Sequence, residues 1–95
     1  MLTRSQIIET ALPVLMKHGV KRAGLFGSYA DGTATEKSDI DLLVEMKAGS
    51  SLIELATLQI DLEDHFARKV DVVEYAGIKP LLRRSILDQE FRFHE

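Results

Sequence analysis

The sequence contains no cysteine, no excess of basic residues and no long apolar run. Without cysteine, a disulfide scaffold, a thiolate zinc site and a cysteine nucleophile are all excluded. The net charge of −3 argues against a sequence-independent clamp on nucleic acid, because such a clamp needs a broad basic face. The longest wholly apolar stretch, Ala11–Met16, is far shorter than the roughly 20 residues that span a membrane. Met1–Ser5 also lacks the apolar core of a secretion signal, so we expect a cytoplasmic protein without a membrane or direct nucleic-acid partner.

The composition is that of a folded globular protein. Hydrophobic residues make up 45% and charged residues 28% of the 95 positions. No repeat, linker or low-complexity run divides the chain, so residues 1–95 are expected to form one domain. Acidic side chains outnumber basic ones between Gly27 and Ser51. An acidic centre of this kind is either a solvated loop or a cation site.

Apolar spacing and capping residues predict alternating helices and strands. A helix is expected to start at Thr3, which has capping-box spacing to Gln6, and to stop at Gly19. Pro13 lies inside this helix and predicts a kink or two shorter helices, because proline removes a backbone donor. The later elements are strands at Val20–Phe26, Ile40–Val44 and Val70–Tyr75, a helix behind a Ser51/Glu54 capping box, and a last helix from Pro80. The predicted fold class is α+β (α/β-like), a small mixed β-sheet flanked by helices.

Several other features have ordinary structural explanations. Apolar stripes on the two later helices are expected to be core: Leu55, Leu58, Leu62 and Phe66 on the first, and Leu81, Leu82 and Ile86 on the second. The histidines are separated along the chain, and we expect surface or packing residues rather than ligands at His18, His65 and His94. Arg68-Lys69 and Arg83-Arg84 are expected to be solvated ends, and Tyr29 and Tyr75 to pack or to line a cleft.

The pattern with the most chemical content is Gly27-Ser28, ten residues, and then Asp39-Ile40-Asp41. Asp39 and Asp41 are two apart on a predicted strand, so both carboxylates leave the same face. Such a pair is unfavourable unless it lies in water or holds a cation. Gly27 lets a bulky anion approach the backbone, and the Ser28 hydroxyl can donate to a phosphate oxygen. Together these groups suit a nucleoside triphosphate bound through magnesium.

A third carboxylate, Asp71, lies on the next predicted strand, across one helix. This separation allows its strand to lie beside the strand of Asp39 and Asp41. Phosphoryl transfer with two metal ions often uses three such oxygen sources, one ion orienting the triphosphate and the other activating the attacking hydroxyl. A lone aspartate in a strand is a weak signal, because it can also be an exposed strand residue, but we favour the metal role for Asp71.

These motifs resemble those of the polymerase-β-like nucleotidyltransferases. The short form, with Leu25–Ala30 and Ser38–Val44, is similar to the minimal nucleotidyltransferase (MNT) antitoxins over nearly the whole chain. The resemblance implies the fold of that family, a small mixed sheet flanked by helices. It implies that the catalytic and metal-binding residues are Asp39, Asp41 and Asp71, which would ligate two magnesium ions. It also implies that Gly27 and Ser28 bind the nucleotide, which is ATP.

The resemblance further implies a magnesium-dependent protein adenylyltransferase that acts as an antitoxin. Such a protein transfers AMP from ATP to a tyrosine hydroxyl of a partner HEPN-domain ribonuclease toxin, and a hetero-oligomer with that partner is expected. Asp31 stands where many relatives have a basic residue, so an antitoxin that is catalytically weak or inactive and acts by stoichiometric binding is the alternative. Lys37, Arg83 or Arg84 could supply the missing charge. Transfer to a small-molecule hydroxyl is disfavoured, because there is no second domain to enclose such an acceptor.

Overall fold

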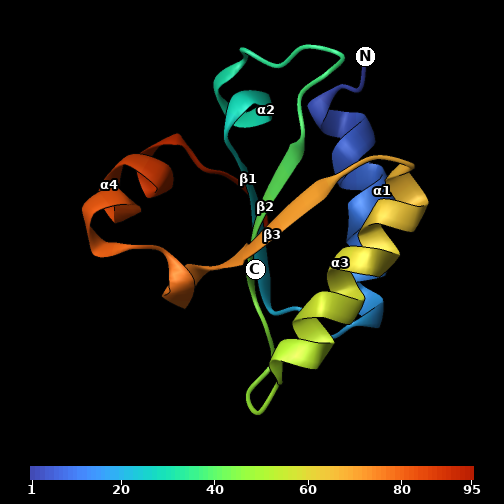
Figure 1. The fold of residues 1–95 in the computed structure, drawn as a ribbon, viewed down its shortest axis with the longest axis vertical. Coiled ribbons are helices and arrows are strands. Elements are labelled where there is room, and N and C mark those ends of the chain that lie inside the picture. The colour runs from blue at the N-terminus through green and yellow to red at the C-terminus, as the bar shows by residue number, and fades with distance from the viewer.

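A computed structural model describes residues 1–95 and shows a four-stranded sheet flanked by helices (Figure 1). Along the chain the elements are α1 (Arg4–Lys17), β1 (Arg22–Phe26), α2 (Ser28–Asp31), β2 (Ile40–Glu45), α3 (Leu52–Phe66), β3 (Val70–Glu74), the 3-10 helix η1 (Tyr75–Gly77), α4 (Pro80–Gln89) and β4 (Phe91–His94). The strand order is β3-β2-β1-β4. Strand β1 is antiparallel to both its neighbours and β2 is parallel to β3, so the predicted mixed sheet is confirmed. None of the helices has the length and apolar character needed to cross a lipid bilayer.

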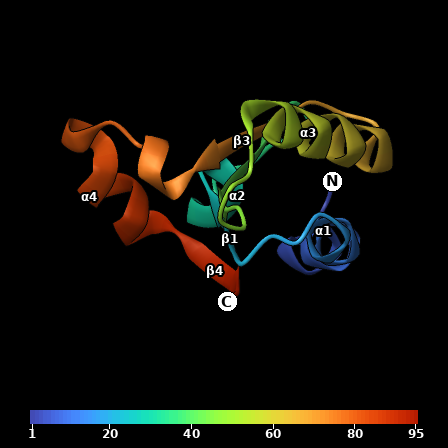
Figure 2. The ribbon, with the colours of Figure 1, turned by 90° about the horizontal axis from the view of Figure 1, so that it is seen from below.

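The sheet separates two apolar clusters of unequal size. Helices α1 and α3 lie together on one face, and α4 projects from the other (Figure 2). Because side chains alternate along a strand, β2 sends three fully buried residues into the larger cluster under α1 and α3: Ile40, Leu42 and Val44. On the opposite face, called the α4 face below, Leu43 packs with Tyr75 and Ile78. The same alternation puts Asp41 on the α4 face.

Helix α1 begins and ends where the sequence predicted. The Thr3 hydroxyl accepts a hydrogen bond from the Gln6 N–H, and Gln6 Oε1 accepts one from the Thr3 N–H, which completes the capping box. Gly19 follows the helix with φ +72°. The predicted break into two shorter helices at Pro13 is wrong, because α1 is continuous through it. Pro13 has no N–H to donate to the Glu9 carbonyl. Both residues are exposed, so water can hydrogen-bond to that carbonyl instead.

Polar contacts cap the start of α3 and join α3 to α1 through Asp61. Ser51 caps α3 by accepting a hydrogen bond from the Glu54 N–H, which is the first half of the predicted capping box. Farther along α3, Asp61 Oδ2 lies 2.8 Å from His18 Nε2, and Asp61 Oδ1 lies 3.3 Å from His65 Nδ1. The hydrogen bond from His18 is the main cause that holds the pKa of Asp61 below its usual value. The packing role expected for these histidines therefore includes a shared carboxylate that links the helices.

The C-terminal part of the chain differs most from the sequence-based prediction. Strand β4 follows the helix that was expected to be the last element, and the short helix α2 lies in a stretch expected to be a polar turn. The core prediction for α4 is wrong for Leu81 and Leu82, which are 97% and 52% exposed. It is confirmed for Ile86, which packs on the sheet together with Leu87. A short helix that touches the sheet along one end leaves the apolar residues of its other end in water.

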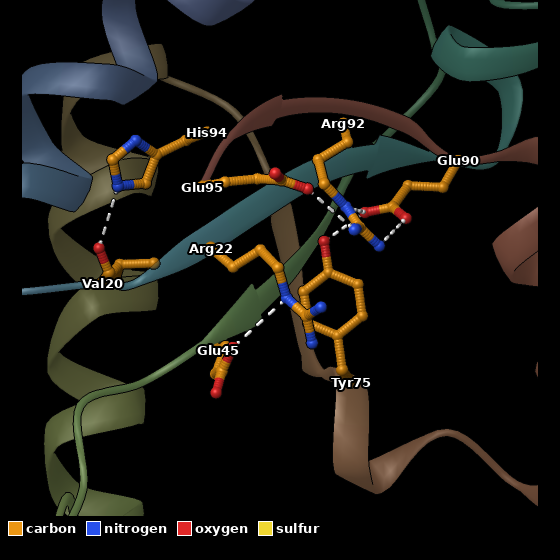
Figure 3. A network of polar contacts seen from close by, with 8 residues as sticks. All are labelled: Val20, Arg22, Glu45, Tyr75, Glu90, Arg92, His94 and Glu95. Atoms are coloured by element: carbon orange, nitrogen blue, oxygen red, sulfur yellow. Dashed lines mark hydrogen bonds and ion pairs between the residues drawn. The ribbon is translucent and has the colours of Figure 1, made fainter.

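A polar network on the α4 face joins β4 and its preceding residue to Tyr75 (Figure 3). The Tyr75 hydroxyl donates to Glu90, and Arg92 Nη2 donates a 2.8 Å hydrogen bond to Glu90 Oε1. The Arg22 guanidinium lies 4.4 Å from the centre of the Tyr75 ring, and Arg22 Nε lies 3.2 Å from Glu45 Oε1. Burial, followed by the hydrogen bond to Glu90, raises the pKa of Tyr75 above its usual value. Tyr75 therefore remains protonated and acts as a donor in this network.

Gly24 on β1 leaves the space that Glu90 occupies. A β-carbon at this position would collide with the Glu90 carboxylate. We expect Gly24→Ala to lower the free energy of unfolding by about 2 kcal/mol, because the carboxylate must leave its partners. Urea denaturation measures this change, and Gly77→Ala is the control, since a β-carbon there has no neighbouring atom within 4 Å. Equal losses in the two variants would contradict the role given to Glu90.

Candidate functional site

The three predicted carboxylates meet on the α4 face, at the start of the parallel pair β2–β3. The register places Asp41 directly opposite Asp71. Asp39 lies two residues before Asp41, and side chains two apart on an extended chain leave the same face. The expectation that the strand of Asp71 lies beside that of Asp39 and Asp41 is confirmed. Two acidic groups from adjacent strands and a third just before β2 are thus neighbours on one surface.

Asp41 is the most perturbed of these carboxylates. It is half-buried, and its pKa is raised to about 6. Burial is the largest cause, followed by the charge of Asp71, a hydrogen bond shared with Asp71, and the charge of Asp39, while Lys69 acts in the opposite direction. A raised pKa of a carboxyl group means that the ionised form is disfavoured where it stands. A cation at this position would relieve that repulsion.

Gly27 brings the backbone against Asp41. Its φ of +69° and ψ of −149° belong to a region that residues with a side chain rarely adopt. A β-carbon at Gly27 would collide with the Asp41 carboxylate. The preceding residue, Phe26, pairs with Asp41 across the β1–β2 ladder, and Ser28 opens α2 immediately afterwards. The Gly27-Ser28 turn therefore lies beside the carboxylates, as the proposed triphosphate site requires.

Hydrogen bonds fix this turn relative to the carboxylate strands. Arg68 Nη1 donates to the Tyr29 hydroxyl at 2.9 Å, and Arg4 Nε donates to the Tyr29 carbonyl at 3.0 Å. The Ile40 N–H donates to the Lys69 carbonyl at 3.3 Å. These bonds connect α2, the start of β2 and the start of β3, so the three parts of the site are held together. Tyr29 is buried, in agreement with the packing role expected for it.

The basic residue beside the carboxylates is Lys69, which was expected to be a solvated end. Its Nζ lies 3.7 Å from Asp39 Oδ2 and 3.9 Å from Asp71 Oδ1. The sequence did contain a signal for it. Lys69 and Asp71 have the same two-residue spacing as Asp39 and Asp41, so the two pairs face each other once the strands align in parallel.

Arg83, Arg84 and Asp31 make contacts outside the carboxylate group. Arg83 Nη1 donates a 2.7 Å hydrogen bond to the Tyr75 carbonyl, and Arg84 lies in an exposed ion pair within α4. Asp31 accepts hydrogen bonds from the hydroxyl and the N–H of Thr33, which hold the pKa of Asp31 below its usual value. Asp31 therefore closes a local turn after α2.

The chemistry of the donor set fits a hard divalent cation. Asp39, Asp41 and Asp71 present only carboxylate oxygens, the ligands that magnesium prefers. As the side chains stand, no three acidic or histidine residues are arranged to hold one ion, and the Lys69 ammonium faces two of the carboxylates. The raised pKa of Asp41 means that its ionised form is disfavoured by burial and by the neighbouring carboxylates. Bound magnesium would supply positive charge and would polarise a phosphate group.

Comparison with known proteins supports nucleotidyl transfer. The family described as "Nucleotidyltransferase domain" matches residues 7–92. A protein of Methanocaldococcus jannaschii, MJ0435, is provisionally named a protein adenylyltransferase. It is 47% identical to this chain over 85 residues, which cover 90% of this chain and 91% of the relative. Similarity therefore extends over most of both proteins.

Solved structures agree with the sequence comparison. A provisionally assigned minimal nucleotidyltransferase matches with a TM-score of 0.78 and 38% identity, over 93% of this chain and 89% of the other. A variant of the toxin–antitoxin MntA–HpeT matches with a TM-score of 0.73 and 25% identity, over 98% of this chain and 72% of the other. Because sequence and fold agree over most of the chain, this protein belongs to the nucleotidyltransferase domain family, as a minimal nucleotidyltransferase of the polymerase-β-like superfamily.

Proposed function

We propose that this protein is a magnesium-dependent protein adenylyltransferase that acts as an antitoxin. It transfers AMP from ATP to a tyrosine hydroxyl of a partner HEPN-domain ribonuclease toxin, with which it forms a hetero-oligomer. The observation that carries this proposal is the group formed by Asp41 and Asp71 on adjacent parallel strands and by Asp39 just before β2, beside the Gly27-Ser28 turn. The name of the Methanocaldococcus jannaschii relative supports a protein acceptor, and the MntA–HpeT complex supports a toxin partner. We propose the cytoplasm as the location, because the reaction needs ATP.

Each part of the proposed site has a chemical task. The backbone at Gly27 leaves room for the triphosphate, and the Ser28 hydroxyl donates to a phosphate oxygen. Asp39, Asp41 and Asp71 would hold magnesium, which when bound offsets the negative charge of the phosphates. Asp71 accepts the proton of the attacking tyrosine hydroxyl. The new bond joins that oxygen to the α-phosphorus, the bond from the α-phosphorus to the bridging oxygen breaks, and pyrophosphate leaves.

The stoichiometric alternative has less support than transfer. It was motivated by Asp31, whose negative charge would repel an anionic ligand. In the structure the Asp31 carboxylate accepts hydrogen bonds from Thr33 at the C-terminal end of α2. The carboxylate whose pKa is raised is Asp41, which lies beside Gly27, where transfer chemistry would need it. Transfer therefore accounts for more of the geometry than binding alone.

The proposal is tested on the toxin co-expressed with this protein. We expect intact-mass spectrometry to show an increase equal to one or more AMP units, and peptide mapping to place it on tyrosine. The Asp39→Asn variant is expected to leave the toxin unmodified, because a predicted metal ligand is lost. Asp88→Asn is the control, since Asp88 is an exposed carboxylate on α4. A toxin that is inhibited but never modified would contradict transfer and would favour the stoichiometric antitoxin.

A further inference from the structure

We infer that Lys69 is a built-in counter-cation of the carboxylate site. It neutralises Asp39 and Asp71 until a divalent ion binds, and its ammonium then moves to the phosphates of the nucleotide. This inference rests on the proposed nucleotide site. Lys69 would contact first the carboxylates and then the phosphates, and this exchange would couple metal binding to nucleotide binding.

The backbone determines where Lys69 lies. In the parallel pair Ile40 is opposite Val70, and the Ile40 N–H donates to the Lys69 carbonyl. One step back along both strands, Lys69 is therefore the neighbour of Asp39. Because side chains two apart share a face, the pair Lys69–Asp71 stands beside the pair Asp39–Asp41 on the α4 face. The site is an array of four side chains, of which three are acidic and one is basic.

The side-chain contacts show that the ammonium is shared and weakly held. Lys69 Nζ lies 3.7 Å from Asp39 Oδ2 and 3.9 Å from Asp71 Oδ1, beyond the range of a short charged hydrogen bond. The side chain of Lys69 is 63% exposed, and those of Asp39 and Asp71 are 45% and 41% exposed. Ion pairs this exposed contribute little to stability, because water screens them. A divalent ion, with twice the charge, can therefore displace the ammonium from both oxygens.

Once displaced, the Lys69 ammonium has one evident new partner, the triphosphate of the nucleotide. It cannot remain next to a divalent ion that binds the same carboxylates, because like charges repel. Lysine is a compact charge on a flexible four-carbon chain, so the head group can turn while the backbone stays fixed. The triphosphate would bring negative charge to the Gly27-Ser28 side of the same face. The ion and the nucleotide should therefore each bind more tightly when the other is present.

The test compares Lys69→Met with the unaltered protein in two titrations. In calorimetry with Mn²⁺ and no nucleotide, we expect the variant to bind the ion about fivefold more tightly, because the competing positive charge is gone. With Mn²⁺ saturating, we expect a non-hydrolysable ATP analogue to bind the variant about tenfold more weakly, because a phosphate contact is lost. Lys69→Arg keeps the positive charge, so it should bind Mn²⁺ as weakly as the unaltered protein does. Lys79→Met is the control, since Lys79 makes no capping bond at the start of α4.

The outcomes separate this inference from the proposed function. If Asp41→Asn abolishes Mn²⁺ binding while Lys69→Met leaves both affinities unchanged, the role of Lys69 is overturned and the metal site stands. If the unaltered protein binds no Mn²⁺ with or without the analogue, both are overturned. Opposite changes in the two titrations support the inference, and a merely structural lysine would not produce them. Circular dichroism checks that each variant is folded.

Discussion

Asp41→Asn is expected to stabilise the fold while it sharply reduces nucleotidyl transfer. The ionised carboxylate is half-buried and lies opposite Asp71, and its pKa is raised to about 6. Asparagine keeps the shape of the side chain but removes the charge. We expect a gain of about 1 kcal/mol in the free energy of unfolding near pH 8 without metal, a value that allows for solvent screening at a half-exposed site. Urea denaturation measures the gain.

The stability gain should depend on pH in a defined direction. In the fold the pKa of Asp41 is about 6, whereas its ordinary value is 3.8. The folded state therefore binds the proton more tightly, so Asp41 destabilises the protein only where it must ionise. The difference between Asp41→Asn and the unaltered protein should be full above about pH 6 and should vanish as the pH falls to about 4. A difference that does not change with pH would contradict the environment described for Asp41.

The same substitution should reduce transfer of labelled AMP to the toxin by about 1000-fold, because one charged oxygen donor of the metal site is lost. The opposite signs of the two effects are the informative result. A variant that is inactive because it is misfolded would lose stability, whereas this variant should unfold at a higher urea concentration. Asp88→Asn is again the control and should change neither quantity. Transfer that persists in Asp41→Asn would remove Asp41 from the proposed mechanism.

Gly27→Ala is expected to cost about 3 kcal/mol of stability, because alanine is strained in this backbone conformation and its β-carbon meets the Asp41 carboxylate. Nucleotide binding should fall with it, since the turn must move. Gly49→Ala is a matched control: its φ of +83° is also left-handed, but a β-carbon there has no neighbour within 4 Å. It should cost only about 1 kcal/mol, the strain without the collision.

A double-mutant cycle isolates the collision. In an Asp41→Ala background the carboxylate is absent, so Gly27→Ala should cost about 1–2 kcal/mol less than it does in the unaltered protein. Gly49→Ala should cost the same in both backgrounds, because it has no contact with Asp41. Strictly additive effects of Gly27→Ala and Asp41→Ala would mean that the two residues do not constrain each other.

Features that depend on neighbours in the chain were predicted well. The Thr3/Gln6 box set the start of α1, because a cap needs only the first turn of its own helix. Asp39 and Asp41 were expected on one face, since alternation is a property of a single strand. The Asp39–Asp41 pair and the family resemblance follow from such local patterns. The exception is Pro13, whose effect depended on whether water could reach the freed carbonyl.

Features that depend on pairing between distant segments required the folded structure. The parallel register of β2 and β3 moved Lys69 from an apparent solvated end to a place beside two carboxylates. Strand β4 had no strong signal of its own, because it is short and gains its hydrogen bonds from β1. The Glu90 network exists only because Gly24 leaves room across the sheet. Each of these depends on which backbones lie side by side, a choice made by the packing of the whole chain rather than by any single stretch of it.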